Sequence, residues 1–195
     1  MPANLRELLI QRAARLQGRP GLTSADWGTL SYAQFRNRVE GVALGLMATD
    51  PPPGSAIFCA TGGPWDWASE LAAACCGLSW GEAGQPVASE ILGGPRFNDE
   101  NGRGPYHERE HGVAEGTLFS LTLDHGAMML RLQRMNKTLG WDHDSEVRLP
   151  MARYGSKELR AALWCSLYGG SHAILEAKTG AWDSTPFKQF WDQAN

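Results

Sequence analysis

The sequence predicts an α/β fold, because it alternates apolar positions at helical spacing with short, continuous apolar runs. The clearest strand is the run Ala56-Ile57-Phe58-Cys59-Ala60, which turn residues bound on both sides. An alanine-rich helix over residues 65–78 follows it. A buried strand that leads directly into a helix is typical of a parallel sheet with crossover connections.

Two further helices and a hairpin are predicted before this strand. Apolar residues recur at helical spacing over residues 5–16 and 31–47, and a hairpin over residues 22–30 separates the two segments. Ser31 and Gln34 have the spacing of a capping box, which predicts that the second helix starts at Ser31.

The second half of the chain predicts more strands and helices after a region of weak periodicity. Residues 82–115 are rich in glycine and proline and predict a long loop within a single domain that covers residues 1–195. The elements expected after it are strands at 117–121, 146–149 and 172–175, helices at 125–139 and 157–168, and a last helix from Thr185 with Phe187, Phe190 and Trp191 on one face.

Composition excludes several classes of function. The chain has 195 residues and a formal net charge of −3, without a basic stripe, so nucleic acid is not an expected partner. No apolar run approaches the length of a membrane span and no signal-peptide core follows Met1, so a cytoplasmic protein is expected. The four cysteines lie in apolar stretches without metal-ligand spacing, which predicts buried free thiols and no metal site.

Four stretches, taken in order, resemble the N-terminal domain of the adenylate-forming enzymes, which include the acyl-CoA synthetases and the adenylation domains of peptide synthetases. These stretches are Leu30-Ser31-Tyr32 through Leu46, Pro53-Gly54 through Gly77, Leu121 through Met129, and Asp144 through Leu175. The resemblance implies a three-layer α/β/α fold with a mainly parallel sheet, equivalent to the first part of that domain. It covers most of the chain except residues 82–115.

One feature of that family is missing from the sequence. In the family, the strand similar to residues 118–120 leads into a loop rich in Ser, Thr and Gly that ends in Pro-Lys-Gly and binds phosphate. Here Ser120 is followed by Leu121-Thr122-Leu123-Asp124, which contains neither glycine nor lysine. Backbone N–H groups that converge on phosphate need glycine, and Asp124 would repel a triphosphate. We therefore assign no catalytic residue and no cofactor.

The candidate ligand-binding residues are Arg153, Tyr154 and His125. Arg153 and Tyr154 stand where the resemblance places the lining of an acyl pocket. His125 starts a predicted helix and would either orient a ligand or satisfy nearby backbone groups, and the second role is favoured. For Thr61-Gly62-Gly63-Pro64 a simple strand–helix turn is favoured over an anion cradle. His107 and His111, four residues apart, are better explained as loop residues than as a metal pair.

These observations predict a non-catalytic, synthetase-like pseudoenzyme that acts as an interaction module or binds an acyl or aryl group. Its expected partner is a second copy of the chain or a biosynthetic enzyme, since the truncated fold would leave strand edges and apolar faces to be covered. The aromatic residues Trp182, Phe187, Phe190 and Trp191 are a candidate covering or contact surface. The alternative is one subunit of a split adenylate-forming ligase that activates a carboxylic acid together with a partner chain.

Overall fold

The computed structural model describes residues 2, 4–52, 54–81, 84–93, 124–151, 156–177 and 182–191. In chain order its elements are α1 (Leu5–Leu16), β1 (Pro20–Ser24), β2 (Gly28–Ser31), α2 (Tyr32–Ala48), β3 (Ala56–Phe58), α3 (Pro64–Cys75), β4 (Ser79–Trp80), β5 (Gln85–Pro86), α4 (Ser89–Gly93), α5 (His125–Leu139), β6 (Glu146–Pro150), α6 (Lys157–Gly169), β7 (His172–Glu176) and the 3₁₀ turn η3 (Thr185–Phe187).

The strands form two sheets, and most of their pairings are parallel. The larger sheet has the order β2-β1-β7-β6, in which only the β1–β2 hairpin is antiparallel. The smaller sheet has the order β4-β3-β5 and is parallel throughout. The predicted α/β fold with mainly parallel pairing is confirmed, whereas the division of the described strands into two sheets was not predicted.

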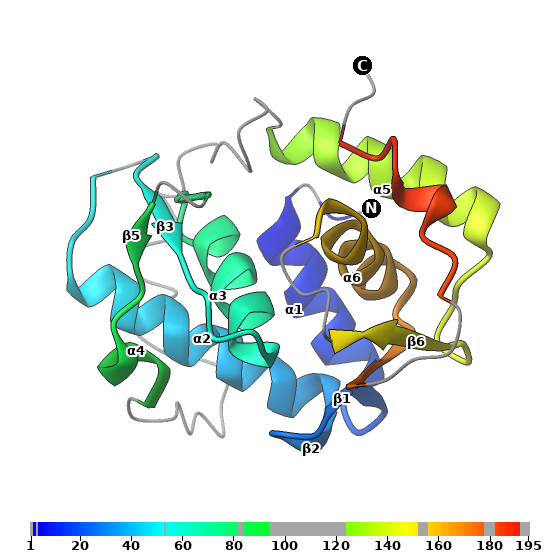
Figure 1. Cartoon of the computed structure of the whole chain (residues 1–195), viewed down its shortest axis with the longest axis horizontal. Helices are drawn as coiled ribbons and strands as arrows, with labels where there is room; N and C mark the ends of the chain where they lie inside the picture. The colour runs from blue at the N-terminus through cyan, green and yellow to red at the C-terminus, as the bar shows by residue number, and fades with distance from the viewer. Residues whose placement is uncertain are drawn as a thin grey trace.

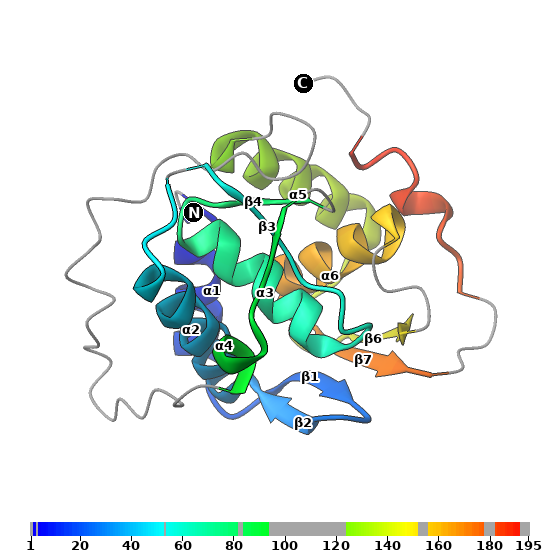
Figure 2. The same cartoon turned by 60° about the vertical axis from the view of Figure 1, so that its left-hand side comes forward.

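The helices α1, α3 and α6 lie between the two sheets (Figure 1), where α1 contacts both α3 and α6. On the larger sheet, alternate residues face this core: Val147 and Leu149 of β6 and Ala173 and Leu175 of β7 are buried. The intervening residues of both strands are exposed or half-buried, as expected for a sheet with one face on the core. Figure 2 shows β1, β2, β6 and β7 gathered on one side of the helices.

Helix boundaries follow the predicted capping residues. Ser31 and Gln34 form the complete capping box that starts α2, and the side chain of Ser156 accepts from Leu159 N at the start of α6. Gly170 ends α6 with φ +81, a left-handed conformation that favours glycine. Helix α5 has the predicted boundaries, and α6 extends one residue beyond its prediction.

The C-terminal aromatic segment packs on the chain's own helices. Instead of the predicted helix, residues 185–187 form a single 3₁₀ turn, and further turns lead to Trp191. Phe187, Phe190 and Trp191 are buried. Trp191 Nε1 donates to the Lys157 carbonyl in α6 at 2.7 Å, and Arg131 of α5 donates to the Phe190 carbonyl at 2.6 Å. These aromatic residues therefore cover the protein's own core.

Part of the sequence lies outside the described residues. This applies to the predicted strand at 117–121, to most of the expected loop at 82–115 and to the pair His107 and His111. Residues 84–93 of that loop region form β5 and α4. No helix in the described ranges is long and apolar enough to span a bilayer.

Candidate functional site

His125 joins the start of α5 to the start of α1. Its imidazole is buried, and Leu5 N donates to its Nδ1 at 3.3 Å. The first N–H groups of a helix have no partner within the helix, so this imidazole satisfies a donor of α1. The neighbouring Asp124 caps α5 by accepting from Ala127 N at 2.7 Å. His125 therefore makes a structural contact between two helices that are distant in sequence.

Arg153 and Tyr154, the other two candidate ligand-binding residues, lie outside the described residues, and their role stays a prediction. The residue that precedes them in the described structure is Met151. Its side chain lies close to Gly63, where a Cβ added to the backbone would be 3.2 Å from Met151 Cε and 3.0 Å from Asp26 Oδ2. The segment after β6 thus starts beside the turn that precedes α3.

This turn, residues 61–63, has its polar groups occupied by the protein's own carboxylate. Asp66 Oδ1 accepts from Thr61 N and from Thr61 Oγ1, both at 2.7 Å, and Asp66 Oδ2 accepts from Gly62 N at 2.8 Å. Asp66 is only 2% exposed. Converging backbone N–H groups at a helix N-terminus can bind an external anion, but here an internal carboxylate already takes that place.

A buried ion pair connects α3 to α6. Arg160 donates to both carboxylate oxygens of Glu70, at 3.0 and 3.3 Å, and Trp164 Nε1 donates to Glu70 Oε1 at 2.8 Å. Glu70 is completely buried. Burial raises the pKa of the Glu70 carboxyl, and the charge of Arg160 and the Trp164 N–H oppose that shift. The guanidinium also lies over the Trp191 ring, 5.5 Å from its centroid.

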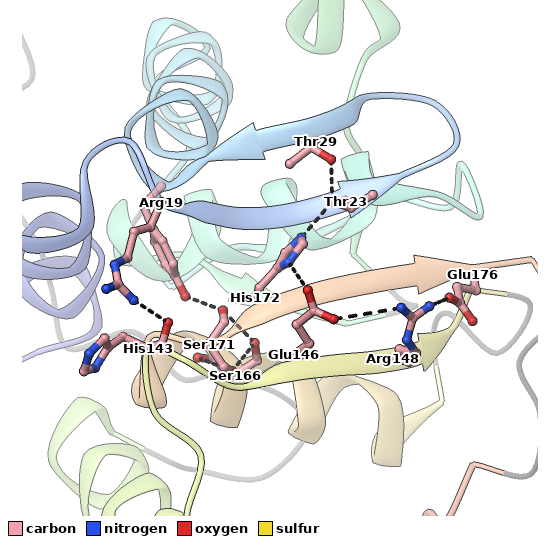
Figure 3. A network of polar contacts seen from close by, with 11 residues as sticks. Arg19, Thr23, Thr29, His143, Glu146, Arg148, Ser166, Ser171, His172 and Glu176 are labelled. Carbon is pink, nitrogen blue, oxygen red and sulfur yellow. Dashed lines mark hydrogen bonds and ion pairs between the residues drawn. The ribbon is translucent and has the colours of Figure 1, made fainter.

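A second polar network crosses all four described strands of the larger sheet (Figure 3). His172 Nε2 lies 2.7 Å from Thr23 Oγ1, which is 2.8 Å from Thr29 Oγ1. On its other side, His172 Nδ1 lies 3.7 Å from Glu146 Oε1. These contacts run from the β1–β2 hairpin through β7 to β6.

At the outer end of this network, Arg148 of β6 pairs with Glu176 of β7 and lies 3.9 Å from Glu146. The side chains of Glu146 and Arg148 are each 60% exposed. Burial lowers the pKa of His172, and the nearby Glu146 carboxylate opposes this. The network thus places two exposed, opposite charges on the outer strand of the sheet.

Burial disfavours the reactive thiolate form at Cys59, Cys76 and Cys165. All four cysteines are free, and Cys59, Cys75 and Cys165 are buried while Cys76 is half-buried, which agrees with the predicted free thiols. Desolvation raises the pKa of Cys59 to about 11. Within the described ranges, no three His, Cys, Asp or Glu side chains gather as metal ligands would.

No protein-family model and no curated protein matches the sequence. Solved structures are similar in fold. The N-terminal domain of FACL13 from Mycobacterium tuberculosis has a TM-score of 0.69 at 12% identity, over 91% of this chain and 58% of that chain. The artificially fused adenylation–PCP di-domain NpsA-ThdA from Klebsiella oxytoca has a TM-score of 0.62 at 15% identity, over 92% of this chain and 40% of that one.

The chain thus shares its fold with part of the N-terminal domain of adenylate-forming enzymes. VinN is similar as well, with a TM-score of 0.63 at 11% identity, over 89% of this chain and 59% of VinN. The chain therefore spans between 40% and 59% of the lengths of these three structures. The N-terminal subdomain of NpsA has also been solved in complex with 3-hydroxyanthranilyl-AMSN.

Sequence reasoning missed three of the polar arrangements within this fold. A signal existed for Asp66, because an acidic residue in the first turn of a helix after Thr-Gly-Gly is well placed to accept from that turn. Glu70 and Arg160 are 90 residues apart, and no local pattern connects them. The His172 network likewise depends on which strands become neighbours.

Proposed function

We propose that this chain is a non-catalytic, synthetase-like interaction module of the cytoplasm that does not bind ATP. The observation that carries the proposal is the filling of the turn before α3 by Asp66, which occupies two backbone N–H groups and a hydroxyl. At the start of α5, Asp124 places another carboxylate on the helix N-terminus. Both helix starts therefore offer negative charge to an approaching phosphate.

The sequence supports the same conclusion. Between Ser120 and His125 there is no glycine to let backbone N–H groups converge and no lysine to neutralise a triphosphate. Stabilising negative charge at the α-phosphate is the main task of an adenylating site. A chain with this sequence would leave that charge unbalanced.

Isothermal titration of the purified chain with ATP·Mg²⁺ tests the proposal. We expect no saturable heat. A titration of the same protein with candidate acyl and aryl carboxylates tests whether the region of Arg153 and Tyr154 binds such a group independently of nucleotide. Clear binding of ATP·Mg²⁺ would refute the non-catalytic role.

A second candidate function is one subunit of a split adenylate-forming ligase. It is supported by the shared fold, since the similar structures include adenylation domains. The NpsA N-terminal subdomain, solved with 3-hydroxyanthranilyl-AMSN, suggests an aryl carboxylate as a substrate class to test. Pyrophosphate release with a co-purifying protein would favour this alternative, and its absence with every carboxylate tried would count against it.

A further inference from the structure

Strand β6 is an outer strand of the larger sheet in the part of the chain that the structure describes. It pairs with β7 in parallel register from Glu146↔His172 to Pro150↔Glu176. Within those described ranges, β7 is its one strand partner. In the part of the chain that the structure describes, no strand bonds to the backbone groups on the outer side of β6, and a strand edge of this kind can pair with another strand.

The register identifies which residues of β6 turn outward. His172 N donates to the Ser145 carbonyl at 2.9 Å, so Ser145 faces β7. In a parallel ladder, alternate residues of a strand direct their backbone N–H and C=O groups to the same neighbour. The backbone groups of Val147 and Leu149 therefore also point toward β7, while their side chains lie on the core face of the sheet. Glu146 and Arg148 consequently direct their backbone N–H and C=O groups away from the sheet.

These same two residues carry opposite charges on one exposed face. Their side chains are each 60% exposed and stand two positions apart, which places them on the same side of the strand. His172 holds Glu146 from one side, and Glu176 holds Arg148 from the other (Figure 3). The order of charge along the outer strand is thus fixed by its neighbours.

We propose that β6 pairs antiparallel with β6 of a second copy of this chain, around a two-fold axis at Val147. This arrangement brings Glu146 opposite Arg148 of the second copy, and Arg148 opposite Glu146 of the second copy, in hydrogen-bonded pairs. Opposite charges directly across an antiparallel ladder are favourable, whereas a parallel copy in the same register would oppose like charges. The charge order therefore selects both the partner and its direction.

The pairing is short, because Pro150 has no N–H to extend the ladder. A stable interface commonly buries about 1,600 Å² in total, more than two short strand segments supply. The dimer is accordingly weak and depends on protein concentration. The inference rests on the proposed interaction role, which it narrows to self-association.

Sedimentation velocity over a concentration series, with charge variants, tests the pairing. The wild-type chain shifts from monomer toward dimer as its concentration rises. Arg148→Glu and Glu146→Arg each place like charges across the ladder. Each variant alone therefore stays monomeric as its concentration rises. An equimolar mixture of the two variants regains it, because the acidic strand of one faces the basic strand of the other. The double variant E146R/R148E also regains it.

The matched control is Arg134→Glu on the exposed face of α5, which changes the net charge by the same amount and leaves the dimer intact. Circular dichroism establishes that each variant is folded. A wild-type chain that stays monomeric throughout, or single variants that dimerise like the wild type, would overturn the pairing. So would a mixture that fails to regain the dimer. The ATP titration gives an independent result, so failure here leaves the non-catalytic proposal standing.

Discussion

The two ion-pair networks of this protein differ in their surroundings. Glu70 and Arg160 are held between α3 and α6, where their side chains are 0% and 13% exposed. Glu146 and Arg148 lie on the outer strand of the larger sheet, and each is 60% exposed. Both networks contain an arginine and a glutamate, but only the second can be reached by another molecule.

This difference separates a structural role from a binding role. A buried charge that loses its partner stays in a medium of low polarity, so breaking a buried pair is costly. An exposed charge that loses its partner is solvated by water, so breaking an exposed pair costs little. The buried network should therefore determine stability, and the exposed network should determine association.

The largest effect is expected from Glu70→Ala, which removes the buried carboxylate that accepts from both Arg160 and the Trp164 N–H. Loss of one member of a buried pair costs about 3 to 5 kcal/mol of unfolding free energy. Urea denaturation followed by tryptophan fluorescence measures it. Glu70→Gln, which keeps an oxygen acceptor for Trp164, is the control and should lose less. Equal losses in the two variants would show that the charge is unimportant.

A second large effect is expected where α6 ends, without touching either network. At Gly170 an added Cβ would lie 2.9 Å from Leu16 Cδ1, and φ is +81. Gly170→Ala should cost about 1 to 2 kcal/mol from left-handed strain, and slightly more because the end of the flexible Leu16 side chain must move aside. Gly140→Ala is the control, since it has φ +66 but open space around it and bears the strain alone. If both variants lose equal stability in urea, close packing of α6 on α1 is not important.

A smaller effect concerns pH and the exposed network. Burial lowers the pKa of His172 below its usual 6.5, so the unfolded chain takes up this proton more readily than the folded chain. The contribution of His172 to stability is thus present above about pH 6.5 and is lost as the pH falls through the lowered pKa. The test is urea denaturation of the wild type and of His172→Gln at several pH values from about 7.5 to about 5, a range that spans the usual histidine pKa. As the pH falls, the free energy of unfolding of the wild type should decrease relative to that of His172→Gln. A difference that is independent of pH would contradict this.

The smallest effect on stability is expected from Arg148→Ala. An exposed ion pair contributes about 0 to 1 kcal/mol, so the midpoint of urea denaturation should hardly change. The same variant should nevertheless weaken the concentration-dependent dimer, because it removes one charge from each cross-strand pair. A large loss of stability with unchanged association would reverse the roles assigned to the two networks.

Local signals in the sequence predicted the helices and strands well, for physical reasons. The capping residues Ser31 and Ser156, and the glycines after residue 168, act within one helical turn and can be read without knowledge of the fold. The prediction of a last helix from Thr185 was wrong. The backbone there forms only a 3₁₀ turn, and Phe187, Phe190 and Trp191 are buried against the rest of the protein. There, tertiary packing outweighed the local pattern.

The polar sites could be predicted only in part. Asp66 lies five residues after Thr61, so its occupation of the turn was within reach of a local argument. His125, by contrast, contacts Leu5, which is 120 residues away, and Arg160 contacts Glu70 across 90 residues. Such pairs depend on how the elements pack, and periodicity contains no information about them. The parts played by Arg153 and Tyr154 stay predictions.

The unfolding temperature of the purified chain with and without excess ATP·Mg²⁺ tests the central claim most directly. A ligand that binds only the folded state stabilises it by about 2.7 kcal/mol at a hundredfold excess over its Kd. With Asp66 and Asp124 at the helix starts, the account predicts no change in unfolding temperature at any nucleotide concentration. An increase that saturates with ATP·Mg²⁺ and is absent with Mg²⁺ alone would contradict it.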